Sequence, residues 1–176
     1  MKKKLRDWFL VILFALLAIF FQFRLLAPIL KDKLEINLIL GLIIWLGFFK
    51  KETEGALMSF IISYLLGAVS GIWSGVYLFS GMSLYLFARL LRARFSPLKI
   101  GAQLLFSWAL AGFYQIFTLI CAGIFVKKEY FSEISSGFLF LEIFLNGLFA
   151  VLVFYLFNQI EGFFDQIPEA LETKKV

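Results

Sequence analysis

Residues 55–88 read GALMSFIISYLLGAVSGIWSGVYLFSGMSLYLFA, and these 34 residues contain no charged side chain. Basic residues flank the run, with Lys50 and Lys51 before it and Arg89 after it. One straight helix of this length would measure about 50 Å, whereas the hydrocarbon core of a bilayer is about 30 Å thick. We therefore expect the run to fold back on itself within a membrane, as two helices joined by a turn at residues 71–75.

The composition of the whole chain also indicates an integral membrane protein. Hydrophobic residues make up 62% of the 176 residues and charged residues 16%, against about 45–50% and 25% in ordinary soluble domains. The net charge of +5 comes from basic residues beside apolar segments, which argues against nucleic-acid binding. There is no histidine and only one cysteine, so histidine-dependent chemistry and an internal disulfide are excluded.

We expect an all-α fold with six transmembrane helices in a single domain over residues 1–176. Only helices fit, because lipid cannot hydrogen-bond free backbone groups and the sequence shows no alternating strand pattern. The expected spans cover residues 8–26, 36–49, 55–70, 76–91, 100–126 and 136–159. The first span follows a basic start that resembles a secretory signal, but it is long enough to cross the membrane, and we interpret it as a retained anchor.

The distribution of charge predicts the orientation. An even number of spans puts both termini on one side, and with the termini in the cytoplasm twelve of the 17 lysines and arginines lie on that side and five on the other. A short amphipathic tail follows at residues 160–176, with acidic residues opposite its apolar ones and Pro168 within it. This tail either docks onto the basic segment 89–99 or a partner, or is a solvated end.

Small residues recur every four positions through the first part of the uncharged run. The stripe consists of Ser59, Ser63, Gly67, Gly71 and Gly75. Residues four apart share a helix face, and a smooth stripe lets two helix backbones approach closely. Two interpretations stay open: a groove for a partner's transmembrane helix, or internal packing against neighbouring helices of the same chain.

Among the polar side chains within the expected spans, four are candidate site residues: Arg24, Gln115, Glu142 and Asn146. Charge in a bilayer interior is unfavourable by at least a few kcal/mol, so a buried Glu needs a partner or a wet cavity. Arg24 and Glu142 lie at similar expected depths, which favours an ion pair between them; alternatively, Arg24 extends to the interface and Glu142 makes a structural hydrogen bond. Gln115, which shares a face with Thr118, either lines a cavity or bonds across helices.

Short motifs stand in a fixed order along the first 95 residues. They read Lys33-Leu-Glu-Ile-Asn-Leu38, Glu54-Gly-Ala-Leu-Met-Ser-Phe60, Ser70-Gly71 and Arg89-Leu-Leu-Arg92-Ala-Arg94-Phe95. This order resembles the MreD family of rod shape-determining proteins. The chain departs from the family at four places: Leu34 and Glu35 replace the usual Pro and Asp, and Ser63 and Gly67 stand where Gly and Asp are usual.

The resemblance implies a non-enzymatic component of the cell-elongation machinery for peptidoglycan synthesis, in the bacterial cytoplasmic membrane. It implies a scaffold with no catalytic residue, metal or cofactor. The implied partners are MreC, a bitopic protein with one membrane helix, and indirectly a peptidoglycan transpeptidase and the RodA polymerase. The fold of the family is likened to the substrate-binding subunits of energy-coupling-factor vitamin transporters, which also have about six helices.

A transporter subunit is itself the main alternative function. It would need a polar cavity near the outer face, for which Arg24, Glu142 and Asn146 are the available residues. The sequence does not support a function as an intramembrane enzyme, because the chain lacks histidine, paired membrane carboxylates and any catalytic motif at a usable spacing.

Overall fold

The computed structural model describes residues 2–26, 28, 36–70, 74–94, 100–125 and 136–172, and every element in these ranges is helical. The elements are α1 (Lys2–Phe21), a π-helical segment η1 (Gln22–Leu26), α3 (Leu38–Phe49), α4 (Glu52–Ser70), α5 (Ser74–Arg94), α6 (Ile100–Phe125) and α7 (Ser136–Glu172). The expected all-α fold is therefore confirmed.

Four of these helices are long and apolar enough to cross a membrane. They lie within α1 with η1, α4, α6 and α7. α3 has only 12 residues, about 18 Å of helix, and α5 carries three arginines near its end. The six expected spans thus correspond to six helices, of which four meet the criteria for a membrane span. The run 55–88 is divided between α4 and α5, as expected from its length.

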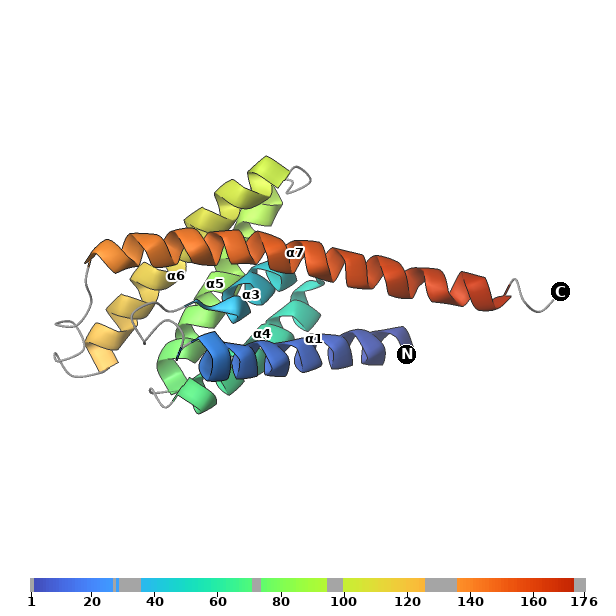
Figure 1. Cartoon of the computed structure of the whole chain (residues 1–176), viewed down its shortest axis with the longest axis horizontal. Helices are drawn as coiled ribbons and strands as arrows, with labels where there is room; N and C mark the ends of the chain where they lie inside the picture. Colours follow the sequence, from blue (N-terminus) through green and yellow to red (C-terminus); the bar gives the residue numbers. More distant parts are fainter. Residues whose placement is uncertain are drawn as a thin grey trace.

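α3 is the central helix of the bundle. It contacts α1, α4, α5, α6 and α7, and all residues from Ile39 to Phe48 are buried. Figure 1 shows α3 between α1 and α7, with α5 and α6 crossing at a steep angle. Because α3 is apolar on every side, it has no face suited to contact with water, and the surrounding helices bury it on every side. This arrangement explains how a helix too short to span a bilayer is accommodated.

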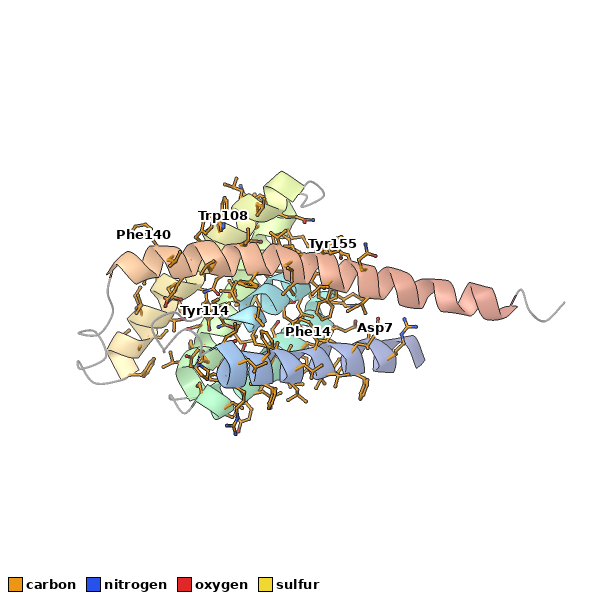
Figure 2. All side chains as sticks on the ribbon, viewed as in Figure 1. Asp7, Phe14, Trp108, Tyr114, Phe140 and Tyr155 are labelled. Carbon is orange, nitrogen blue, oxygen red and sulfur yellow. The ribbon has the colours of Figure 1, made fainter. Side chains whose placement is uncertain are left out.

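The outer faces of the surrounding helices remain apolar. Phe9 on α1, Phe60 on α4 and Phe140 on α7 are 65%, 46% and 76% exposed, and Figure 2 shows Phe140 projecting away from the bundle. Large aromatic side chains also pack on the inner faces, where they contact one another. Phe14, for example, lies between α1 and α7 (Figure 2), with its ring centroid 4.8 Å from that of Phe157. An apolar exterior over several helices is what contact with lipid requires.

α7 continues well past its expected end at residue 159. Its 37 residues correspond to about 55 Å of helix, nearly twice the thickness of a bilayer core. Figure 1 shows its last part extending beyond the other helices, on the side of the view where α1 begins. The segment 160–172 of the expected tail is thus helical and continuous with the last span.

Candidate functional site

The small-residue stripe packs inside the bundle. Ser59 and Ser63 are fully buried, and Gly67 is buried as well. α5 lies opposite Ser63, where a Cβ added to Gly81 would overlap the Ser63 side chain. All three residues are therefore packed inside the bundle and do not form an open groove. The reason is that α5 turns back directly against α4 and needs the same smooth surface that a partner helix would use.

The ends of the stripe differ from its middle. Gly71 lies outside the described residues, and Gly75 is exposed with no atom within 4 Å of an added Cβ. Gly55, four residues before Ser59, extends the stripe in the other direction, because an added Cβ there would lie 2.9 Å from the Tyr85 ring. The spacing in the sequence already contained this signal, since residues 55, 59, 63 and 67 continue the same four-residue period.

A polar cluster joins α3, α6 and α7 at the start of α3. The Asn37 backbone N–H donates to Asn146 Oδ1 at 2.7 Å, and its side-chain amide donates to the Tyr114 hydroxyl at 3.3 Å. One residue along α6, Gln115 Nε2 donates to Glu142 Oε2 at 2.9 Å. These bonds satisfy polar groups that lipid would leave unpaired. Three of the four polar residues expected within the spans thus belong to inter-helix hydrogen bonds in this cluster.

Arg24 is not part of this cluster. It is exposed in η1 and forms no ion pair among the described residues. The expected pair between Arg24 and Glu142 is therefore wrong. Similar depth in a membrane does not bring two side chains into contact: α1 and α7 meet at Phe14 and Phe157, but Glu142 faces α6, where Gln115 donates a hydrogen bond to it.

The sequence interpretation missed Asn37 and Tyr114. Asn37 is the N-cap of α3, where its side-chain Oδ1 accepts from the Leu40 backbone N–H at 3.2 Å. Asn directly before an apolar helix is a recognisable capping signal. Tyr114 carries no such signal, because a tyrosine within an apolar span is ordinary.

A second cluster closes the other end of α3. Arg89 Nη1 and Arg92 Nη1 from α5 both donate at 3.1 Å to the carbonyl of Lys50, the C-cap residue that follows α3. Arg89 Nη2 also donates to Glu52 Oε1 at 2.7 Å. Lys50 Nζ lies 3.6 Å from Asp7 Oδ2 of α1. The basic residues that indicated topology in the sequence thus join α1, α3, α4 and α5.

Trp45 extends this second cluster to α7. It is fully buried, and its indole N–H donates to Asn158 Oδ1 at 3.3 Å. The Lys50 ammonium lies 5.1 Å from the centre of the Trp45 ring, a cation–π distance. Figure 2 shows Tyr114 of the first cluster and Asp7 of the second on opposite sides of the bundle centre. Polar contacts therefore hold both ends of α3, while its middle is apolar.

Comparisons with protein-family models, with curated proteins and with solved structures found no match. The resemblance to the MreD family therefore stays a prediction from the short motifs in residues 33–95.

Proposed function

We propose that the chain is a non-enzymatic membrane scaffold of the bacterial cell-elongation machinery, resembling MreD and binding the transmembrane helix of an MreC-like protein. In this proposal it lies in the cytoplasmic membrane with both termini inside, and contacts a peptidoglycan transpeptidase and a RodA-like polymerase indirectly. The observation that carries the scaffold role is the solid interior, because α3 fills the centre of the bundle with buried apolar side chains.

The same observation weighs against the alternative function as a vitamin-binding transporter subunit. Such a subunit needs a polar cavity that opens near one end of the bundle. In the described part of the chain, the polar groups at the start of α3 bond to one another, as in the Gln115–Glu142 hydrogen bond. Further along α3, the centre of the bundle is filled by the side chains of Leu40, Ile43 and Ile44, each at most 1% exposed.

The partner helix must use the outward faces of the bundle, because α5 covers the stripe at Ser59 and Ser63. Each outer helix offers a large exposed phenylalanine: Phe9 on α1, Phe60 on α4 and Phe140 on α7. These side chains are in place to contact lipid or another helix. Replacing one of them with alanine therefore tests docking without opening the core.

The experiment is co-expression with the MreC-like protein of the same genome, followed by affinity purification in mild detergent. We expect the MreC-like protein to co-purify and an unrelated single-span protein to stay behind. Among Phe9→Ala, Phe60→Ala and Phe140→Ala, the variant on the docking face should lose the partner while keeping its thermal unfolding temperature. Recovery of a bound vitamin together with an ATPase module, without the MreC-like protein, would overturn the proposal.

A further inference from the structure

An open hollow of about 340 Å³ lies at the corner between α3 and α4. Its lining includes Phe49, Lys50, Lys51, Glu52, Arg89 and Arg92. This volume falls within the range of about 300–1,000 Å³ that small-molecule sites occupy. Four of these six side chains are cationic and one is acidic, so the hollow is suited to an anion.

Two of the four cations already have carboxylate partners. These are Lys50, which pairs with Asp7, and Arg89, which pairs with Glu52. The other two, Lys51 and Arg92, are exposed and have no carboxylate within ion-pair distance among the described residues. Within the described residues, the lining therefore carries two cations that are outside any ion pair.

Arg92 is also held in position at this site. Its Nη1 donates to the Lys50 carbonyl at 3.1 Å, which fixes the guanidinium on the wall of the hollow. The planar guanidinium has five N–H groups, and its other donors stay available. A fixed guanidinium beside a flexible ammonium is a common arrangement for binding phosphate, since Arg bonds it in a forked geometry and Lys adds charge.

The hollow lies at the boundary of the membrane-spanning part of the chain. The apolar helix α3 ends at Phe49, and the candidate span in α4 begins at Glu52. Phe49 lies beside the cations in the lining and gives the hollow an apolar wall. A site that combines charge with an apolar wall at this level faces the phosphates and glycerol groups of the lipid leaflet rather than bulk solvent.

We propose that this hollow binds the phosphate group of an anionic phospholipid headgroup, with Lys51 and Arg92 as the charged ligands. Soluble phosphate shares this chemistry, but the level of the hollow and the Phe49 wall favour the lipid. The site is separate from the partner-binding role proposed above and does not depend on it. Bound lipid would give an anionic partner to the two cations that have no ion pair among the described residues.

The test is native mass spectrometry of the purified full-length chain in detergent, titrated with phosphatidylglycerol or with phosphatidylcholine. We expect phosphatidylglycerol to bind more tightly than phosphatidylcholine, and Arg92→Gln to weaken its binding roughly fivefold, since one direct hydrogen bond to the phosphate contributes about that factor. The double variant Lys51→Gln/Arg92→Gln should bind phosphatidylglycerol roughly thirtyfold more weakly. Equal binding of the two lipids would overturn the proposal.

Arg94→Gln is the matched control. Arg94 is exposed in the same last turn of α5 and loses the same charge, but it does not line the hollow. Phosphatidylglycerol affinity should change less than twofold in this variant, and a loss equal to that of Arg92→Gln would refute a defined site. The lipid-free unfolding temperature separates lost binding from lost folding, and Lys51→Gln provides a second variant if Arg92→Gln is destabilised.

A competition experiment distinguishes the two sources of phosphate. Inorganic phosphate and glycerol 1-phosphate at millimolar concentration should leave the bound phosphatidylglycerol in place. If either displaces it fully at that concentration, the hollow binds soluble phosphates and the lipid assignment is wrong.

Discussion

Replacing Gly81 with alanine tests the close approach of α4 and α5. The added Cβ would overlap the Ser63 side chain and lie 3.3 Å from Ile43 Cδ1, so one of the two helices has to shift. Overpacking of a well-packed site destabilises by about 1–3 kcal/mol, and the better helix propensity of alanine returns about 1 kcal/mol. The added Cβ overlaps both heavy atoms of the Ser63 side chain, so the upper part of the overpacking range, about 2–3 kcal/mol, applies, and we expect a net loss of about 1–2 kcal/mol in the free energy of unfolding.

Gly75→Ala provides the control on the same helix. No atom lies within 4 Å of its added Cβ, so stability should stay unchanged or rise by up to about 1 kcal/mol. Unfolding of the purified variants by SDS titration, followed by circular dichroism, measures both differences. A second substitution, Ser63→Gly, removes the overlapping atoms and should restore most of the stability lost in Gly81→Ala.

The two single variants, Gly81→Ala and Ser63→Gly, together with their double variant and the original chain, form a double-mutant cycle. This cycle gives the coupling energy between the two residues. If Gly81 and Ser63 contact each other as the structure has them, their coupling energy should reach about 1 kcal/mol or more. Full stability of Gly81→Ala, or a coupling energy near zero, would refute internal packing of the small-residue stripe. The groove interpretation of the stripe would then be open again.

Three further substitutions test the core and the polar cluster. Phe154→Ala should destabilise by about 3–5 kcal/mol because the side chain is 1% exposed, whereas Phe140→Ala on the lipid face of the same helix should change little, both measured by SDS unfolding. Gln115→Leu removes the Glu142 hydrogen bond and should lower stability by about 1–3 kcal/mol, while Glu142→Gln should lose less; equal losses would contradict this account. Asn37→Ala removes the N-cap of α3 and should lower the free energy of unfolding by about 1–2 kcal/mol, which a lower thermal unfolding temperature would show.

Hydropathy and length in the sequence were enough to predict the helices. The absence of charged residues between Gly55 and Ala88 identified an apolar segment. This segment is too long to cross a bilayer once, so a reversal within the membrane was required. The order and approximate bounds of the helices follow from such local properties, and the structure has a helix at each expected span. The end of α7 differs because an amphipathic segment can continue a helix beyond the membrane, which hydropathy alone does not indicate.

Relations between helices were less predictable. The four-residue period of Ser59 and Ser63 showed which face of α4 is smooth, but not that α5 would cover it. α3 is apolar on every side, so no periodicity pointed to its central place. Glu142 was paired with the wrong residue because depth along a span is a one-dimensional property, whereas a partner is set by which helices lie side by side.

The position of α3 also sets the order in which the chain can complete its fold during synthesis. Its start is bonded to Asn146, its Trp45 indole to Asn158, and the carbonyl of its C-cap residue Lys50 to arginines of α5. All these partners are synthesised after α3, and the last of them lies more than 100 residues further along the chain. The nascent protein therefore holds a short apolar helix without its full set of neighbours until α7 is made, and a chain interrupted before Asn158 lacks part of the contacts that fix its own centre.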